Sequence, residues 1–384
     1  MSVTLPQPPI FVIGPERSGT TLVMAMLGNH PHIAVPEVAW FYPRFRPYAH
    51  TYGDLSVKAN FRTLVEEMIF GLKTPLWDLP VNPRVIVDEL VQAAPERSFA
   101  GAYAAILGRY AEYLGKPRWG EKTPYNLFFV DQILEDFPNA QFVVITRDGR
   151  DASADYLESS FGPTNILAAA EIWALNQRTI AAARTRVSAT QWFDVRYETL
   201  VRQPEAELER IAAFLGVEYS PAFLEFHTTA IAQARGAQRD HAPLGHPVSD
   251  RYIGIHKTLL SLRDQRIFAH VAGKELTEAG YEVDVEPLQP TEAEIRRWRD
   301  YDARIRAATL DSEDGHIVYE SYNDWLVDQR EARRRAGVWS EHPAPPPFPI
   351  ATPHEELVQG FRAWRHWKET FGVKRRYTSS RPVL

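Results

Sequence analysis

The sequence predicts an α/β fold, in which a parallel sheet of the P-loop type carries helices on both faces. Apolar runs at 10–13, 141–146 and 190–195 are typical of buried strands. Each run is followed by a segment with helical periodicity. Strands that alternate with helices in this way indicate a parallel sheet that is covered on both faces.

The first strand leads into a glycine-containing loop before a helix that starts at Thr20. The spacing Gly14-x-x-x-x-Gly19 matches a Walker phosphate loop, but Thr20 stands where a nucleotide triphosphatase needs lysine. Backbone N–H groups and the positive end of the helix dipole suit a phosphate or sulfate at such a loop. The nearest cation is then Arg17, whose guanidinium can fork onto two oxygens. These features favour an adenylyl-sulfate-type ligand over ATP.

The segment after the first helix contributes a candidate base. A short strand predicted at 33–35 ends just before Glu37, which places this carboxylate beside the loop. Residues 38–48 are rich in aromatic side chains, which either wall an apolar pocket or pack onto the core. Apolar repeats predict helices within 58–116, and a turn is predicted at 119–124.

The strand at 141–146 delivers Arg147 at its carboxyl end, where ligands collect in open α/β sheets. The segment 230–255 is rich in glycine, proline, histidine and arginine, and we predict a loop there. The remaining helices of this part of the chain are predicted at 125–136, 166–186, 205–215 and 259–279.

The C-terminal part of the chain differs from the rest. Helical stretches at 292–306 and 322–335 precede a proline-rich segment at 343–349, which is a stiff linker by composition. A final helix is predicted at 354–371. The basic residues at 374–376 are interpreted as a solvated end.

Composition limits the classes of function. A chain of 384 residues with 45% hydrophobic residues can bury a sizeable core, and its formal charge of -6 argues against a dedicated nucleic-acid binder. It contains no cysteine, which excludes disulfides, a thiolate nucleophile and cysteine-ligated zinc. The start of the chain does not resemble a signal peptide, and no apolar run is long enough to span a membrane. We therefore expect a cytoplasmic protein without a membrane anchor.

Five segments together resemble the family of sulfotransferases that use 3′-phosphoadenosine 5′-phosphosulfate (PAPS). The chain is similar to bacterial members and to the tyrosylprotein branch. The segments follow the family's order: Arg17–Leu22, His30–Pro31 with Glu37, Glu121–Pro124, Arg147–Arg150, and Arg196–Val201 continuing to Gly216. The resemblance implies a sulfotransferase domain over residues 1–283. Residues 284–384 then form a helical accessory region that either covers the acceptor or mediates self-association.

The resemblance implies in-line transfer of a sulfonate from PAPS to a hydroxyl, with release of the desulfated nucleotide PAP. Glu37 is the candidate general base, with His30 and His32 as nearby alternatives; a solvated carboxylate is the other interpretation of Glu37. Lys122 is expected to contact the bridging oxygen and the sulfonate, unless it only pairs with Glu121 or another carboxylate. Arg17 completes the catalytic set. Arginine and lysine can hold a sulfonate, so the resemblance implies no metal.

The donor-binding residues that the resemblance implies are Arg17, Ser18, Gly19, Thr20, Thr21, Arg147, Asp155, Tyr197, Arg251 and Lys257. Asp155 stands where the family usually places a serine on the 3′-phosphate of the donor. Either Arg147 and other basic residues hold this phosphate at reduced affinity, which we favour, or the donor lacks it. On the favoured interpretation, Asp155→Ser tightens PAP binding and barely changes binding of adenosine 5′-phosphosulfate. Tyr197 either touches the nucleotide or packs in the core, and His256 stands where the family has tryptophan near Lys257.

The acceptor is expected to be a small molecule, a glycan or a lipid. The arginines that bind acidic peptides in the tyrosylprotein branch are not matched in position by Arg44 and Arg46. Homo-oligomers are possible, and neither nucleic acid nor an integral membrane contact is expected. Two other classes of protein remain as alternatives to a sulfotransferase. A P-loop phosphotransferase needs the missing loop lysine, and a non-catalytic nucleotide-binding protein has no use for Glu37 and Lys122 together.

Overall fold

The computed structural model of the chain describes most residues before 311 and a few near 333. The described residues are 2–70, 77, 81–159, 162–237, 239–310, 329, 332, 333 and 335–337. The predicted linker at 343–349, the final helix at 354–371 and the basic tail lie outside them, as does most of the helix predicted at 322–335.

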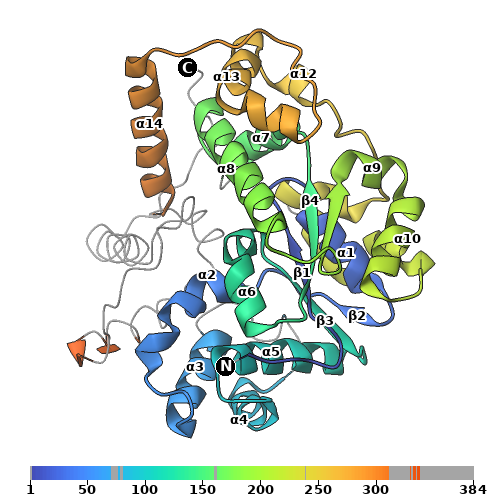
Figure 1. Ribbon diagram of the computed structural model, residues 1–384, viewed down its shortest axis with the longest axis vertical. Helices are drawn as coiled ribbons and strands as arrows, with labels where there is room; N and C mark the ends of the chain where they lie inside the picture. The colour runs from blue at the N-terminus through green and yellow to red at the C-terminus, as the bar shows by residue number, and fades with distance from the viewer. Residues whose placement is uncertain are drawn as a thin grey trace.

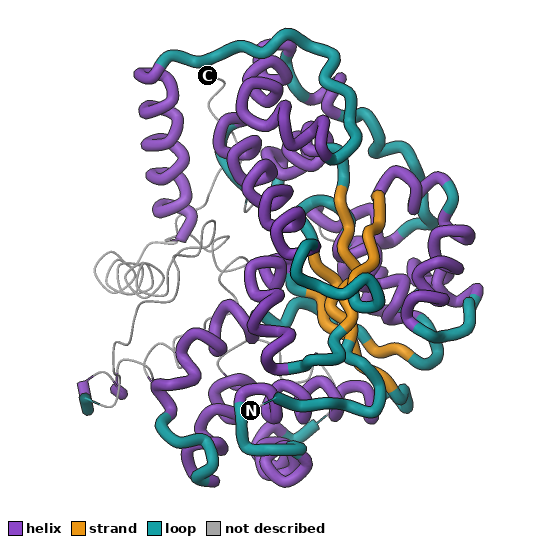
Figure 2. Tube along the Cα trace, in the orientation of Figure 1, coloured by secondary structure: helices purple, strands orange, loops and turns teal. Residues whose placement is uncertain are grey.

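Five parallel strands form one sheet in the described part of the chain, in the order β2-β3-β1-β4-β5. Figures 1 and 2 show this sheet at the centre of the molecule with helices on both sides, which confirms the predicted fold class. The strands are β1 (Ile10–Ile13), β2 (Ile33–Ala34), β3 (Arg118–Lys122), β4 (Gln141–Thr146) and β5 (Trp192–Arg196).

Helices fill the connections between the strands. The α-helices are α1 (Thr20–Asn29), α2 (Phe41–Phe45), α3 (Lys58–Phe70), α4 (Pro83–Ala93), α5 (Phe99–Tyr113), α6 (Val130–Asp136), α7 (Gly149–Glu158), α8 (Ile166–Arg184), α9 (Tyr197–Arg202), α10 (Pro204–Leu215), α11 (Ala230–Gly236), α12 (His256–Leu259), α13 (Leu262–Glu278) and α14 (Glu292–Leu310). The 3₁₀ segments are η1 (Arg46–Tyr52), η3 (Pro124–Phe129), η4 (Pro221–Thr228) and η5 (Arg239–Gly245).

The core lies on both faces of the sheet because successive strand residues point to opposite sides. Phe11 and Ile13 of β1 pack into a cluster with α5 and α6, whereas Ile10 and Val12 pack with α1, α9 and α10. Figure 1 shows α6 and α8 on one side of β1 and β4, with α1, α9 and α10 on the other. A third cluster joins α7, α8 and α13, centred on Trp173.

Two expectations from the sequence are wrong. The turn predicted at 119–124 is instead largely strand β3, whose five residues are all buried. Its charged residues are unusual in a buried strand, and the sequence pattern therefore did not indicate one. Its Arg118 donates to two backbone carbonyls at 2.6 Å, which satisfies a buried guanidinium. The loop predicted at 230–255 contains α11 and η5, and the Thr229 hydroxyl caps α11 by accepting from the N–H of Ala232 at 3.2 Å.

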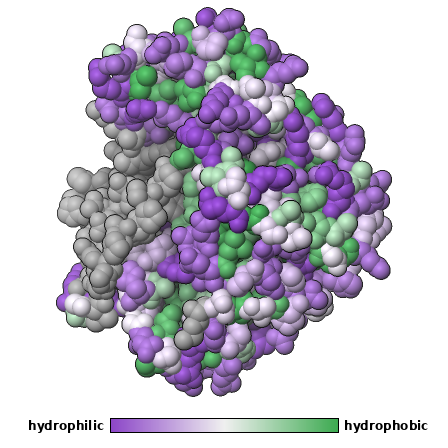
Figure 3. Space-filling model, viewed as in Figure 1, coloured by the Kyte–Doolittle hydropathy of each residue, from purple (hydrophilic) through white to green (hydrophobic). Residues whose placement is uncertain are grey.

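Of the two interpretations of the aromatic segment 38–48, core packing is confirmed for three side chains, whereas Trp40 and Tyr48 are partly exposed. Phe41, Tyr42 and Phe45 are each at most 1% exposed. Among the residues that the structure describes, no helix combines the length and the hydropathy that a membrane span requires. Hydrophilic and hydrophobic residues are interspersed on the face of the molecule shown in Figure 3.

Residues after 284 contact the sheet-containing part of the chain. Trp298 of α14 is buried in the third cluster, and the Asp302 carboxylate accepts from the backbone N–H of Thr164 at 2.7 Å. Further along, Arg333 forms an ion pair with the buried carboxylate of Glu67. The division into two domains at 283 stays a prediction, and these contacts tie its two parts together.

Candidate active site

The loop after β1 is shaped by residues with unusual backbone angles. Gly14 has a φ of 148°, and a Cβ placed on it would lie 2.2 Å from the carbonyl oxygen of Ile145 on β4. Only glycine fits there without moving the sheet. Arg17 and Gly19 also have positive φ values, of 63° and 99°. The result is a tight turn that aims the start of α1 at the carboxyl edge of the sheet.

The start of α1 is suited to hold an anion. No side chain caps this helix at Gly19, so its first N–H groups and its dipole are not used by a residue of the loop. The hydroxyl of Ser18 is buried and has no hydrogen-bond partner among the described residues. Buried hydroxyls are normally paired, so this one fits a site that a phosphate or sulfonate oxygen completes.

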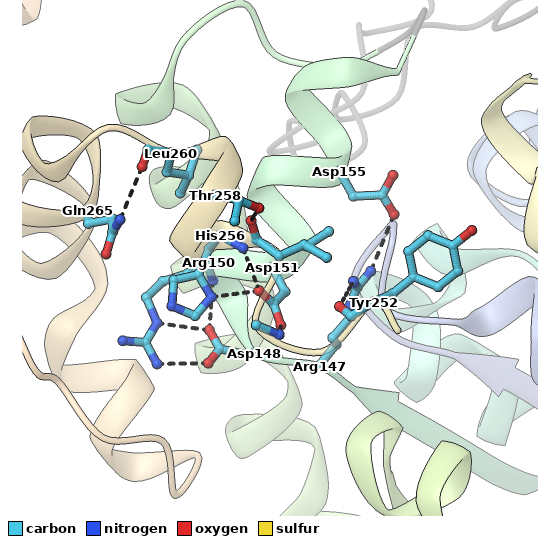
Figure 4. Close-up of polar contacts among 12 residues, drawn as sticks. Arg147, Asp148, Arg150, Asp151, Asp155, Tyr252, His256, Thr258, Leu260 and Gln265 are labelled. Atoms are coloured by element: carbon cyan, nitrogen blue, oxygen red, sulfur yellow. Dashed lines mark hydrogen bonds and ion pairs between the residues drawn. The ribbon is translucent and has the colours of Figure 1, made fainter. Parts of the chain in front are cut away.

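Arg17 and Arg147 lie on the same side of this loop. Arg147 directly follows β4, and its guanidinium donates to the carbonyl oxygen of Arg17 at 3.0 Å and stacks 4.7 Å over the ring of Tyr197. Asp155 of α7 accepts from both guanidinium groups, at 2.8 Å from Arg17 and 3.2 Å from Arg147. Figure 4 shows the carboxylate of Asp155 pointing at Arg147, which also donates to the carbonyl of Tyr252.

Lys122 ends β3 at the same edge and contacts the start of α1. Its Nζ lies 3.4 Å from the hydroxyl oxygen of Thr21, and the residue is 4% exposed. Burial lowers the pKa of Lys122 to about 8, and the negative charge of Glu37 nearby offsets part of this shift. An ammonium group held beside the loop at this pKa can act as a cation toward a transferring group.

The neighbouring Glu121 points away from Lys122, because adjacent strand residues face opposite sides of the sheet. The two residues form no ion pair among the described contacts, although the negative charge of Glu121 nearby still raises the pKa of Lys122. Burial raises the pKa of Glu121 to about 7, and its carboxylate accepts from Thr123 and Asn126. Pairing with Glu121 therefore does not account for the position of Lys122.

Glu37 follows β2 and is held by a residue that the sequence did not single out. Both of its oxygens accept from the guanidinium of Arg235 on α11. The two side chains are 27% and 33% exposed, so Glu37 is not the solvated carboxylate of the alternative interpretation. Burial and the charge of Glu37 raise the pKa of Tyr110 to about 12. Glu37 thus lies within electrostatic reach of Lys122, Arg235 and Tyr110.

A second residue missed by the sequence analysis is His241 of η5. Burial and the nearby cations Lys122, Arg17 and Arg235 lower the pKa of His241 to about 3, so its imidazole is neutral at pH 7. The sequence predicts a loop for the segment that carries Arg235 and His241. Its composition carries no signal that it folds over the carboxyl edge of the sheet.

Of the two histidines considered as alternative bases, His30 has a structural role and His32 is exposed. His30 is 2% exposed, its Nε2 lies 3.0 Å from the carbonyl oxygen of Glu218, and its ring stacks on Phe223 at 4.8 Å. The backbone N–H of His32 donates to Nδ1 of His30 at 3.1 Å. Both nitrogens of His30 are therefore engaged at the C-terminal end of α1, away from the loop that begins this helix.

The late segment predicted to cover the nucleotide is only partly brought to the loop. The carbonyl of Tyr252 reaches Arg147, but the exposed side chain of Arg251 stacks on the Tyr252 ring at 4.7 Å. Lys257 is exposed and lines a different hollow of about 450 Å³, together with Arg196 and Glu198 among others. The described contacts thus leave the side chains of Arg251 and Lys257 outside the group around Arg17.

A compact set of charges results at the carboxyl edge of the sheet. Arg17, Lys122 and Arg147 surround the start of α1, and two carboxylates, Glu37 and Asp155, lie among them. Cations at a helix start can hold a multiply charged anion, and a carboxylate beside them can accept a proton from a hydroxyl. This arrangement suits transfer of an anionic group to a hydroxyl.

Comparisons with known proteins agree with this chemistry. The model of the sulfotransferase family matches residues 8–221. The chain is 26% identical over 222 residues to a protein-tyrosine sulfotransferase of Drosophila melanogaster, covering 56% of this chain and 40% of that protein. It is 25% identical over 292 residues to protein-tyrosine sulfotransferase 1 of Danio rerio, covering 73% and 74%. The sulfotransferase domain of the Synechococcus PCC 7002 olefin synthase superposes with a TM-score of 0.53 at 20% identity, over 73% of this chain and 98% of that one. This last likeness concerns the fold.

Proposed function

The chain belongs to the sulfotransferase family and is a sulfotransferase, and we propose that it moves the sulfonate of PAPS to a hydroxyl of a small molecule, glycan or lipid. One observation carries the proposal. The loop cation Arg17, the buried Lys122 and the carboxylate Glu37 lie at one edge of the sheet, around the start of α1.

The donor is proposed from the residues around the loop. The N–H groups at the start of α1, the unpaired Ser18 hydroxyl and Arg17 suit the phosphosulfate end of PAPS. Arg147 stacks on Tyr197 and lies beside them, where it can pair with a second phosphate of the same nucleotide. The missing loop lysine argues against a nucleoside triphosphate.

Glu37 is proposed as the general base. It takes the proton of the acceptor hydroxyl as the new S–O bond forms, and the bond from sulfur to the 5′-phosphate oxygen breaks, leaving PAP. Lys122 and Arg17 stabilise the charge on the sulfonate and on the departing phosphate oxygen. Arg235 donates one N–H to each oxygen of Glu37 and holds the carboxylate at the sheet edge, and each oxygen keeps a second lone pair that can accept the proton.

A small or lipid-like acceptor is favoured over an acidic peptide by the two arginines that follow Glu37. Arg44 is 5% exposed and lies 5.4 Å from the Trp40 ring centroid, and Arg46 forms an ion pair with Asp136 at 2.8 Å. Neither guanidinium is presented to a peptide. A cytoplasmic location and self-association stay predictions from the sequence.

The donor proposal is tested by thermal denaturation with PAP, ATP or ADP, with and without Mg²⁺. We expect PAP to raise the melting temperature more than ATP or ADP at equal concentration. Stabilisation by ATP with Mg²⁺ but not by PAP would favour a phosphotransferase instead. Stabilisation by PAP without any consumption of PAPS across phenolic, sugar, steroid and lipid alcohols would favour a non-catalytic nucleotide-binding protein.

A further inference from the structure

Asp155 joins two cations that the donor needs. It lies on α7, and its two oxygens reach Arg17 at 2.8 Å and Arg147 at 3.2 Å. The side chains of these arginines are 12% and 4% exposed, whereas that of Asp155 is 30% exposed. The carboxylate is therefore more exposed to solvent than either of the guanidinium groups with which it pairs.

The two arginines depend on this carboxylate to different degrees. Arg147 also donates to the carbonyls of Arg17 and Tyr252, at 3.0 and 2.7 Å, and stacks on Tyr197. The guanidinium of Arg17 has Asp155 as its only hydrogen-bond acceptor among the described contacts, and its Nε is buried without a partner. Asp155 thus supplies the negative charge that the neighbouring guanidinium groups otherwise lack.

We infer that Asp155 is an internal counter-anion that occupies the anion site of the free protein and exchanges for a donor phosphate. The inference rests on the proposed donor. A phosphate oxygen that binds Arg17 or Arg147 must take the place of a carboxylate oxygen or lie beside it, and like charges so close repel. Asp155 therefore lowers the affinity for the nucleotide and sets which nucleotides are bound.

The contact with Arg17 changes what the sequence alone predicted. If Asp155 faced only the 3′-phosphate, substitution of Asp155 would leave the affinity for adenosine 5′-monophosphate unchanged. Because Asp155 also binds Arg17 in the loop, its substitution increases the affinity for adenosine 5′-monophosphate as well. This increase is smaller than the increase in affinity for PAP. Arg147 keeps its stacking on Tyr197, so PAP stays the better ligand.

A purely structural role makes the opposite prediction. If Asp155 only held Arg17 and Arg147 in place, its loss would scatter them and weaken nucleotide binding. The sign of the affinity change therefore separates the two interpretations. In the free protein both interpretations lower the melting temperature, since the guanidinium groups lose their shared partner.

The test is isothermal titration calorimetry of PAP and adenosine 5′-monophosphate with the full chain. Asp155→Asn keeps the shape of the side chain, and Asp155→Ser installs a hydroxyl, so two substitutions guard against a change in folding. Asp131→Asn is the matched control, because Asp131 also pairs with an arginine, Arg186, at 3.0 Å but on the exposed surface between α6 and the end of α8. It removes the same net charge without touching the site.

We expect both Asp155 substitutions to tighten PAP binding by about tenfold, and Asp131→Asn to change it less than twofold. Unchanged or weaker PAP binding in folded Asp155→Asn and Asp155→Ser overturns the inference and leaves the donor proposal standing, provided that the wild type binds PAP. If no form of the protein binds PAP or the monophosphate, the donor proposal fails instead, and the inference fails with it.

Discussion

Replacing Glu37 by glutamine tests the proposed base with little change in shape. The amide cannot take the proton of an acceptor hydroxyl, and loss of a general base costs about 10²–10⁴ in rate, or about 3–5 kcal/mol of barrier. Glu37 contacts Arg235 of α11 and not Arg17 or Arg147. We therefore expect the affinity for PAP to change by no more than about threefold.

The same substitution has two side effects that the structure predicts. The ion pair with Arg235 is about a quarter to a third exposed, so its loss costs about 1 kcal/mol of folding free energy. The charge of Glu37 also raises the pKa of Lys122, so without it that pKa falls below about 8. The alkaline loss of activity in any residual turnover then moves to lower pH.

Arg235→Gln is the matched control for Glu37→Gln, because it breaks the same ion pair and leaves the carboxylate in place. The assay is release of PAP from PAPS with a competent acceptor, measured across pH for the wild type and both variants. If Glu37 is the base, Arg235→Gln keeps far more turnover than Glu37→Gln. Equal losses in the two variants, or near-normal turnover by Glu37→Gln, would refute the reasoning.

Three further predictions concern other residues. With wild-type enzyme, kcat/KM falls above about pH 8 as Lys122 loses its charge, and Lys122→Met abolishes transfer; a flat profile to pH 9.5 contradicts this. Arg17→Ala weakens both PAP affinity in calorimetry and turnover, since it contacts the anion in the ground and transition states; unchanged PAP affinity would count against the loop assignment. Truncation at Pro287 leaves Glu67 buried without Arg333 and lowers the melting temperature; a monodisperse fragment with wild-type stability and turnover contradicts a role for the C-terminal part.

The sequence was informative where local pattern decides structure. Strands β1 and β4 are apolar runs with turn residues at their ends, and their carboxyl ends carry the loop and Arg147. The parallel order of the sheet then places these residues at one edge without any knowledge of side-chain packing. For this reason the neighbourhood of Arg17 and Arg147 follows from the sequence, whereas the strand that places Lys122 at the same edge was predicted as a turn.

Contacts between residues far apart in the sequence determine the parts of the fold and of the site that could not be predicted. β3 carries three charged residues among five, and only the partners of Arg118 and Glu121 explain why such a segment is buried. Arg235 lies 198 positions from Glu37, and no local pattern reports that α11 folds back over the sheet edge. The bridging of Arg17 and Arg147 by Asp155 likewise depends on how α7 packs beside the loop.

Transfer of labelled sulfonate from PAPS tests the central claim most directly. The full chain is incubated with PAPS labelled in its sulfonate and with pooled alcohols of phenolic, sugar, steroid and lipid type. We predict that label appears in an acceptor with the mass gain of one SO₃ group, that PAP accumulates in equal amount, and that Glu37→Gln suppresses both. Binding of PAPS with no labelled acceptor and no PAP from any pool, or transfer that is equally fast with Glu37→Gln, would contradict the account.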